Sequence, residues 1–376
     1  MSFPRVFVTK RDISNVRPSG DVIGEGNFCS VQAVTDIHSG LDGALKVFPK
    51  HDVRRLHKEK DVLMEKHALS RLDHPRIVKL LFTFKDSDNC YIVTDLCRGG
   101  ELWGLCEKSG LGEGRAKMYM TQILSAVAYM HRMGIVHRDI KAENIFLSAD
   151  QRNVKVGDLG SARDLYNPVV KGAGNSSVSR LYNKVIHSLE HYVGTPNFMA
   201  PEAIVNEEND ELSDIWSLGC LIYQIIIGIP PFVAGSEYLV FLRVRATDLQ
   251  FPPRGISSEC VDLIRSILQP VRSKRPSIGD IMTNKFFQDV PVSPPPMSEV
   301  DLRLQSIARD LTVSITDEYI NEFPDLMHGD LYRIKTVREW FTRSQPGSGT
   351  DMLSHLDLSP GLLGTSNDPE FSSDND

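Results

Sequence analysis

The chain has 376 residues, of which 41% are hydrophobic and 24% are charged, so it can build a sizeable core and exceeds one small domain. Its formal net charge of −7, with no long basic stripe, argues against nucleic-acid binding. The six cysteines lack C-x-x-C spacing and no apolar stretch follows basic residues at the start, so we expect a reducing compartment, the cytoplasm with possible nuclear access, rather than secretion.

The first motif in chain order is a glycine-containing turn, Gly24-Glu25-Gly26, between two strand-like runs. Its glycines lack a Cβ atom, so backbone N–H groups there could approach a phosphate closely. Taken alone this signal is weak, because a two-glycine turn between strands is more often an ordinary hairpin. The following strand-like run carries Lys46, which could neutralise phosphate oxygens if an acidic partner holds its flexible side chain.

A helix predicted from about Asp52 to Leu72 supplies the candidates for that partner. The acidic residues on or near it are Glu59, Asp61, Glu65 and Asp73. We prefer Glu65, because it lies one turn before Leu69 and an ion pair and a core contact would then share one helix face. The alternative is that Glu65 is only a solvated residue on a charged helix.

The most informative part of the sequence is the run HRDIKAEN at residues 137–144, followed by DLG at residues 158–160. Strand-like runs at 145–147 and 154–156 lie between the two motifs. Either motif alone would be weak. Together, at this separation, they strongly indicate transfer of the γ-phosphoryl group of Mg·ATP to a hydroxyl.

Four side chains of these motifs have chemistry that suits such a transfer. Asp139 can accept the hydrogen bond of the substrate hydroxyl, and Lys141 can meet the negative charge of the transferred phosphate. Asn144 and Asp158 provide oxygen ligands of the kind that Mg²⁺ prefers.

The remaining part of the chain divides by hydropathy and charge. The most apolar segment, residues 218–229, is too short to span a bilayer and predicts a buried helix. Residues 291–376 hold 15 acidic and 6 basic side chains, a net charge of −9, so residues 1–290 carry about +2. The proline-rich run 291–296 predicts a stiff linker, and residues 298–311 a further helix. The last 30 or so residues are expected to be disordered.

With these motifs the chain resembles a eukaryotic Ser/Thr protein kinase over about residues 19–290 and, within that family, the phosphoinositide-dependent type of the AGC group. The closer resemblance is carried by residues 71–75, 78–80, 82–84, 100–102, 218–224 and 230–238. It implies an α+β, bilobal fold. A small lobe, 19–96, would hold a five-stranded sheet and one main helix, and a large lobe, 97–290, would be mainly helical. An N-terminal extension, 1–18, and an acidic C-terminal extension, 291–376, would flank them.

The resemblance also implies an activity. The chain would be a Mg²⁺- and ATP-dependent Ser/Thr kinase, and Lys141 is typical of that acceptor class. The type further implies an upstream kinase that phosphorylates the activation segments of other AGC kinases in growth and survival signalling. Alternatives are an active Ser/Thr kinase with unrelated substrates, or a non-catalytic ATP-binding scaffold. The scaffold is disfavoured by the presence of all five central residues, Lys46, Glu65, Asp139, Asn144 and Asp158.

The ATP-site residues are assigned by the same resemblance. Thr94 is expected at the back of the adenine pocket, and Asp95 C=O and Cys97 N–H are expected to pair with adenine. Glu101 is expected to meet the ribose. The full predicted ATP site consists of Gly24, Glu25, Gly26, Val31, Ala44, Lys46, Thr94, Asp95, Cys97, Glu101, Glu143 and Asn144.

Internal supports of the site are implied in the same way. Leu69, Leu80, His137 and Leu159 would form an apolar column that links the lobes. Asp214, on a buried helix, would cap the catalytic loop, which consists of residues 137–144.

An activation segment is expected from Asp158 to Glu202. Within it, Thr195 would support Asp139 and Lys141, and Glu202 would pair with Arg275. The segment is longer than the family pattern, and the position of the self-phosphorylated serine of this type is occupied by Glu190 or His191. We hypothesise that a phosphate on Ser188, or the carboxylate of Glu190, pairs with Arg138. The alternative is a loop without regulatory function.

A docking groove for a phosphorylated Phe-x-x-Phe tail of a substrate kinase is the last implied feature. Its predicted residues are Arg11, Lys50, Val53, Val62, Lys66, Thr83, Lys85 and Ile92. The alternative is that the basic residues only form a solvated face. The acidic extension does not resemble a lipid-binding pleckstrin-homology domain, so direct phosphoinositide binding is doubtful.

Overall fold

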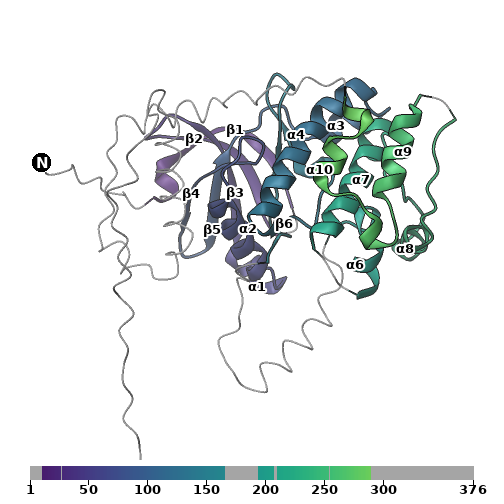
Figure 1. Ribbon diagram of the computed structural model, residues 1–376. Helices are drawn as coiled ribbons and strands as arrows, with labels where there is room; N and C mark the ends of the chain where they lie inside the picture. The colour runs from purple at the N-terminus through teal and green to yellow at the C-terminus, as the bar shows by residue number, and fades with distance from the viewer. Residues whose placement is uncertain (1–10, 27, 166–193, 207–209, 254, 289–376) are drawn as a thin grey trace, which may run out of the picture. The chain divides into compact units, whose positions relative to one another are not determined.

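The computed structural model describes residues 11–26, 28–165, 194–206, 210–253 and 255–288 (Figure 1). All of them belong to the first of the two units, Met1–Arg333 and Ile334–Asp376, into which the chain divides. Ser188, the proline-rich run, the helix expected at 298–311 and the rest of the acidic extension lie outside the described residues. The domain boundaries therefore stay predictions.

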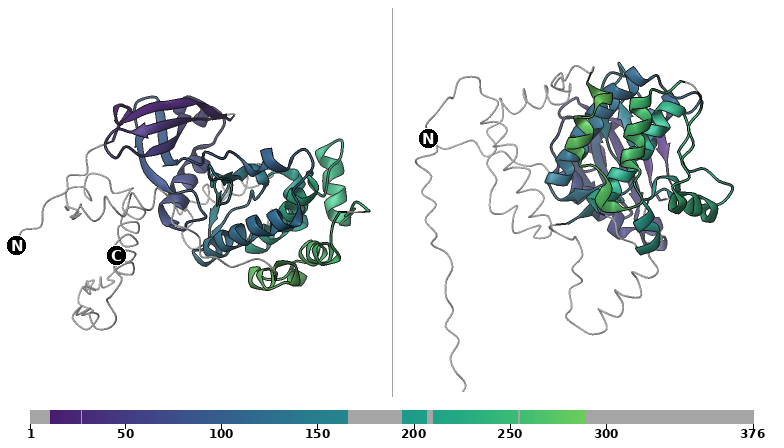
Figure 2. Two further views of the ribbon diagram at one scale, coloured as in Figure 1. Left: turned by 90° about the horizontal axis from the view of Figure 1, so that it is seen from above. Right: turned by 45° about the vertical axis from the view of Figure 1, so that its right-hand side comes forward.

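A five-stranded antiparallel sheet forms the first part of the described chain, after a short turn at Ile13–Asn15. Its strand order is β1-β2-β3-β5-β4. In the left view of Figure 2 the strands of this sheet are drawn in purple and blue. The strands are β1 (Val16–Glu25), β2 (Ser30–Asp36), β3 (Asp42–Pro49), β4 (Leu80–Lys85) and β5 (Asn89–Asp95). Because successive strand residues point to opposite faces, Leu45 and Val93 pack into one apolar cluster, whereas Phe48 and Ile92 pack into the main core.

The helical segment after β3 differs from the prediction of one helix over 52–72, which is wrong. It contains two helices, α1 (Lys50–Arg55) and α2 (Glu59–Arg71). His57 adopts a left-handed backbone conformation with φ 53°, and Lys58 N–H donates to Val53 C=O at 2.8 Å. This closure is a helix C-cap in which glycine usually occupies the left-handed position. A histidine there gave no sequence cue.

The remainder of the described chain is mainly helical. Its helices are α3 (Leu102–Cys106), α4 (Glu113–Arg132), α6 (Pro201–Asn206), α7 (Glu211–Ile227), α8 (Glu237–Ala246), α9 (Ser258–Ile267) and α10 (Ile278–Met282). Short strands are β6 (Ile135–Val136), β7 (Ile145–Leu147), β8 (Val154–Val156) and β9 (Arg163–Asp164), and one-turn 3₁₀ helices lie at Ala142–Asn144, Pro196–Phe198, Arg272–Lys274 and Lys285–Phe287. The predicted α+β bilobal fold class is confirmed. Within the described ranges no helix is both long and apolar enough to cross a membrane.

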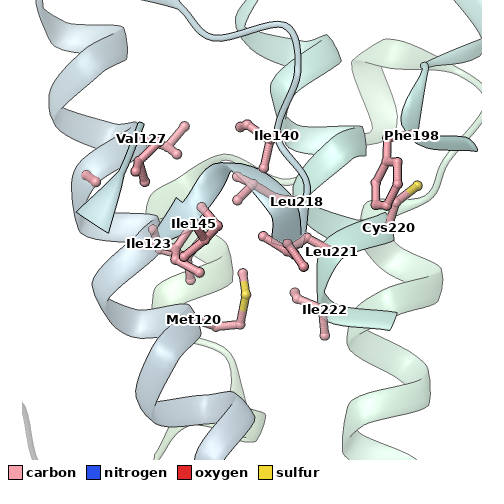
Figure 3. Close-up of a cluster of buried hydrophobic side chains, with 14 of the residues drawn as sticks. Met120, Ile123, Val127, Ile140, Ile145, Phe198, Leu218, Cys220, Leu221 and Ile222 are labelled. Atoms are coloured by element: carbon pink, nitrogen blue, oxygen red, sulfur yellow. The ribbon is translucent and has the colours of Figure 1, made fainter. Parts of the chain in front are cut away.

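Helices α4 and α7 contact each other (Figure 1). Residues Ile140 and Ile145 lie between these two helices (Figure 3). Figure 3 shows Ile123 of α4 and Leu218 of α7 pointing toward Ile140 of the intervening loop and Ile145 at the start of β7. All four side chains are fully buried. The loop that carries residues 137–144 is therefore anchored by apolar packing on two sides.

The predicted buried helix in the apolar segment is α7, which begins with an Asp210 capping box and ends at Gly228 with φ 93°. One glycine inside it has a packing role. A Cβ atom at Gly219 would lie 2.6 Å from Ile267 Cγ2, so α9 can approach α7 closely only because that atom is absent.

The residues expected to link the two lobes are all buried. Leu69 on α2, Leu80 on β4 and Leu159 belong to one continuous hydrophobic core. His137 is also fully buried, and its Nε2 lies 3.0 Å from the Gly157 carbonyl oxygen.

We predict that His74 makes the fold sensitive to mild acid. Burial, with Arg76 and Arg132 nearby, lowers the pKa of His74 to about 4. In the unfolded chain its pKa is about 6.5, so the unfolded state binds the proton more readily. The stability that this group contributes is complete above about pH 6.5 and declines as the pH falls toward 4.

Urea unfolding at pH 7 and pH 5 tests this prediction. His74→Gln should lose less free energy of unfolding between these pH values than the wild type. His51→Gln, at a side chain that is 85% exposed, is the matched control and should behave as the wild type. An equal loss in all three proteins would contradict the prediction.

Candidate active site

The ammonium group of Lys46 lies between two carboxylates that come from distant parts of the chain. Lys46 Nζ is 2.9 Å from both oxygens of Glu65 and 3.1 Å from Asp158 Oδ1. The strand β3 supplies the lysine, α2 supplies Glu65, and the turn after β8 supplies Asp158. Of the four acidic candidates, the structure thus pairs the preferred one with Lys46.

This arrangement favours the charged forms of Lys46 and Asp158, whereas burial raises the pKa of Glu65 despite the Lys46 charge beside it. Burial alone would lower the pKa of Lys46, but the charges of Glu65 and then Asp158 outweigh it and raise that pKa above its ordinary value. Burial would likewise raise the pKa of Asp158, but Lys46 outweighs burial and lowers it. Asp158 is therefore an ionised carboxylate, and 45% of its side chain is exposed to solvent.

A second network joins the catalytic loop to the end of the predicted activation segment. Lys141 Nζ lies 2.9 Å from Asp139 Oδ2 and donates to Thr195 Oγ1 at 2.7 Å. Thr195 donates to Asp139 Oδ1 through its N–H at 3.0 Å and its hydroxyl at 2.9 Å. The structure thus brings together Asp139, Lys141 and Thr195, which the sequence placed in one site.

Gly194 allows this junction. Its φ is 110°, a conformation that side chains disfavour, and a Cβ atom there would lie 2.7 Å from the Arg138 carbonyl oxygen. A larger residue would therefore push Thr195 away from the catalytic loop.

The Asp214 side chain holds the backbone of the catalytic loop through hydrogen bonds. Its two oxygens accept from His137 N–H and Arg138 N–H, each at 2.9 Å, and Oδ2 also lies 2.8 Å from His131 Nε2. Burial would raise the pKa of Asp214, but its interactions with His131 outweigh burial and lower that pKa. Arg138 has φ 68°, an uncommon conformation for arginine, and these bonds hold it there.

The predicted adenine-site residues lie on neighbouring strands. Ala44 of β3 pairs directly with Thr94 of β5. The buried Asp95 side chain accepts from Lys79 N–H at 2.8 Å and forms an ion pair with Lys155 of β8. Burial, with the Asp95 carboxylate nearby, raises the pKa of Cys97 to about 12, so this thiol is neutral at physiological pH. The adenine hydrogen bonds themselves stay predictions.

The glycine turn is not crowded at Gly24. Gly24 pairs with Val31, and Glu25 pairs with Ser30 at the end of the hairpin. A Cβ atom at Gly24 would meet nothing closer than 3.7 Å. Packing within the described residues therefore does not require a glycine at position 24, whereas a Cβ atom at Gly26 would lie 3.3 Å from Cys29 Sγ. Phosphate binding by this turn stays a prediction.

Glu101, which is expected to meet the ribose, and Glu143, another residue of the predicted ATP site, influence each other. Burial and then the Glu143 charge raise the pKa of Glu101. One oxygen of Glu143, Oε2, is buried and has no hydrogen-bond partner. A buried acceptor without a donor fits a ligand hydroxyl that would donate to it.

Asn144 and Asp158 fit the donor set of a magnesium ion. The Asn144 amide nitrogen donates to Asp139 O at 2.7 Å and to Asp139 Oδ2 at 2.9 Å, which leaves its carbonyl oxygen as the remaining ligand atom. Gly157 N–H donates to Asn144 C=O at 3.0 Å, so the two ligand-bearing turns are joined through the backbone. Mg²⁺ takes few protein ligands and completes its shell with water and phosphate.

Two predicted features concern the ends of the activation segment: an anionic partner for Arg138 and the pairing of Glu202 with Arg275. Arg138 Nε donates to Ser161 C=O at 2.6 Å, while Ser188 and Glu190, its hypothesised anionic partners, lie outside the described residues. Glu202 and Arg275 form a buried bidentate pair at 2.6 and 2.7 Å.

The structure contradicts the inclusion of Arg11 in the docking groove. Arg11 Nη1 lies 2.7 Å from Asp36 Oδ1, and its guanidinium carbon is 4.8 Å from the centroid of the Phe82 ring. Phe82 pairs with Val93 on one face of the sheet, whereas the predicted groove residues Thr83 and Ile92 pair on the other. Arg11 therefore lies near the face of the sheet that is opposite Thr83 and Ile92, and because it precedes the first strand, no strand periodicity indicated its side.

The other groove residues are grouped but variously exposed. Val53 and Ile92 are buried in the main core, and Val62 packs against that core. Lys50 Nζ donates to the backbone carbonyls of Asp86 and Ser87. Lys66 on α2 is half-buried, and Lys85 at the end of β4 is exposed. The groove stays a prediction.

Several site residues were missed by sequence reasoning. Lys155 holds the Asp95 carboxylate, and Gln224 Oε1 accepts from Ala142 N–H in the catalytic loop at 3.2 Å. A lone amide within the most apolar helix was an available signal for Gln224. His67 and Arg71 of α2 both contact Asp164 of β9, and no local pattern pointed to this cluster.

The sequence is similar to those of known protein kinases. The family model described as "Protein kinase domain" matches residues 18–287. "Serine/threonine-protein kinase ksg1" of Schizosaccharomyces pombe is 36% identical over 273 residues, which cover 72% of this chain and 45% of that protein. Human "3-phosphoinositide-dependent protein kinase 1" is 33% identical over 278 residues, covering 72% and 47%.

"Serine/threonine-protein kinase PKH2" of Candida albicans is 37% identical over 274 residues, covering 72% of this chain and 28% of that protein. The matched region thus spans less than half the length of these three relatives. The predicted resemblance to the phosphoinositide-dependent type is confirmed.

We predict that Arg275→Met destabilises the fold strongly. The substitution would leave the Glu202 carboxylate buried without its bidentate cation, with Arg272 Nε at 3.9 Å, and breaking such a pair costs about 3–5 kcal/mol. Denaturant unfolding measures the change in the free energy of unfolding. Arg245→Met, on the exposed part of α8, is the control and should change it by less than about 0.5 kcal/mol. Equal changes in the free energy of unfolding for the two substitutions would contradict a stabilising role of the Glu202–Arg275 pair.

Proposed function

The chain belongs to the protein kinase family, and from that premise we propose that it is an active Ser/Thr kinase. It would transfer the γ-phosphoryl group of ATP to a serine or threonine hydroxyl of a protein. The observation that carries the proposal is the convergence of Lys46, Glu65 and Asp158 within 3.1 Å contacts, beside the network of Asp139, Lys141 and Thr195.

Each of these residues has a role that follows from its contacts. Lys46, held by Glu65, neutralises the phosphates that do not leave. Asp139 accepts the hydrogen bond of the acceptor hydroxyl and orients its oxygen toward the phosphorus. Lys141, fixed by Thr195, faces the charge that develops on the transferred group.

Asn144 and Asp158 would hold magnesium, which supplies positive charge to the phosphate oxygens when it is bound. The protein contributes ligands that are already oriented. Asn144 is fixed by its bonds to Asp139, and Asp158 stays ionised beside Lys46.

The finer part of the proposal is an upstream role toward other AGC kinases. The similarity to human 3-phosphoinositide-dependent protein kinase 1 supports it. So do the positions of Val62 and Lys66 on α2 and of Thr83 on β4, because these two elements contact each other. Substrates would carry a phosphorylated Phe-x-x-Phe tail. We place the protein in a reducing compartment, the cytoplasm with possible nuclear access, because all six of its cysteines are free thiols.

Lys46→Met and Asp158→Asn should each lower kcat for phosphate transfer about a hundredfold or more, because the first removes a cation that faces the phosphates and the second removes the charge of a proposed magnesium ligand. The measurement is transfer of labelled phosphate from Mg·ATP to a serine peptide. Lys108→Met and Asp262→Asn, both at exposed positions, are the matched controls and should retain wild-type rates. Full turnover by Lys46→Met or Asp158→Asn would refute the assigned roles.

Lys66→Ala combined with Lys85→Ala should slow phosphorylation of a kinase that bears the phosphorylated Phe-x-x-Phe tail, because two cations near the groove are lost. Activity toward a short peptide without the tail should not change. The same assay with Lys108→Ala controls for loss of charge. An unchanged rate on the tail-bearing kinase would favour an active kinase with unrelated substrates.

A further inference from the structure

We propose that Asp164 binds His67 and Arg71 as a clamp that positions Glu65 for its contact with Lys46. We call these three residues the α2 clamp. The inference rests on the proposed kinase function and assigns three positioning residues that do not themselves face the nucleotide.

The clamp is built around one carboxylate oxygen. Asp164 Oδ2 lies 2.7 Å from His67 Nε2 and also accepts from Arg71 Nη1. The Asp164 side chain is 0% exposed, and that of Arg71 is 11% exposed. Arg71 Nη2 donates in addition to Met133 C=O, beyond the end of α4, at 2.9 Å.

The spacing along α2 explains why the clamp would act on Glu65. His67 and Arg71 are four residues apart, so they lie on one face of the helix. Glu65 is two residues before His67, which is about 200° around the helix axis, so it lies on the other side of the helix, where it meets Lys46. The α2 helix is therefore held at Glu65 by β3 and at His67 and Arg71 by β9. A rotation of the helix would break both contacts.

The position of Asp164 joins α2 to the rest of the site. β9 pairs with β6 so that Asp164 faces Ile135 and Arg163 faces Val136, directly before the run 137–144. Asp164 also follows Asp158, the predicted metal ligand, by six residues. One carboxylate thus connects the Glu65 helix, the strand that leads into the catalytic loop, and the start of the activation segment.

Burial gives the clamp its effect. Moving α2 away from β9 would leave the Asp164 charge without two of its cationic or hydrogen-bonding partners in a site closed to water, which is costly. The arrangement in which Glu65 reaches Lys46 is favoured for that reason. Because the anion is a side chain of the protein, this link requires no phosphate.

A double-mutant cycle tests the proposal. Asp164→Asn keeps the side-chain shape and removes the charge, and Glu65→Gln removes the partner of Lys46. If the clamp acts through Glu65, Asp164→Asn should lower kcat/KM for ATP and weaken Mg·ATP binding about tenfold in the wild type. In the Glu65→Gln protein it should change either quantity less than about threefold.

Equal losses in both backgrounds would overturn the proposal, since a merely structural residue acts additively. Binding of Mg·ATP by calorimetry reads the clamp without turnover. Wild-type protein that binds Mg·ATP but transfers no phosphate would refute the proposed function while leaving the clamp testable. Asp262→Asn, at an exposed position on α9, is the control for charge removal.

A second pair of variants covers the case in which Asp164→Asn does not fold. His67→Gln keeps a donor near Asp164 and should retain nucleotide affinity, whereas His67→Ala should weaken it severalfold. Equal affinities of these two variants would contradict a role for the His67 contact. His51→Gln is the matched control on α1.

Discussion

The ion pair of Lys46 with Glu65 is the interaction on which the arrangement of the site depends. A lysine side chain is flexible and holds one position only where its charge is matched on more than one side. Here the matching carboxylates come from α2 and from the turn after β8, and each lies within 3.1 Å of the ammonium group. Satisfying this single cation therefore fixes a helix and a turn relative to the sheet.

Buried carboxylates repeat this device elsewhere in the described chain. Asp95, Asp164, Glu202 and Asp214 each have less than a tenth of their surface exposed, and each is paired with groups that are distant in sequence. A charge removed from water is costly unless it is paired, so each pairing selects one position for its segment. Segments that lack long helices or strands thereby acquire defined positions around the catalytic loop.

Two of the five non-glycine residues with positive φ in the described chain lie in this site. Arg138 and Asp158, in the two motifs that carry the chemistry, both have positive φ without being glycine. Such conformations persist only where surrounding contacts determine them. Asp214 provides these contacts at Arg138 by accepting two consecutive N–H groups, and Lys46 provides one at Asp158. Arg138 and Asp158 thus have their backbone conformations fixed beside the groups that would bind magnesium and phosphate.

In the sequence by itself, local spacing and periodicity determined the short strands β7 and β8, the buried helix α7 and the grouping of Asp139, Lys141 and Asn144. The fold class followed from the family resemblance that these motifs carry. The sequence also favoured Glu65 through helix-face geometry. Only the tertiary structure decided that a break separates α1 from α2, that Arg11 lies on the other face of the sheet, and that Lys155 and Asp164 hold buried partners. These features depend on which distant segments meet, and no local pattern encodes how a buried charge finds its partner across the fold.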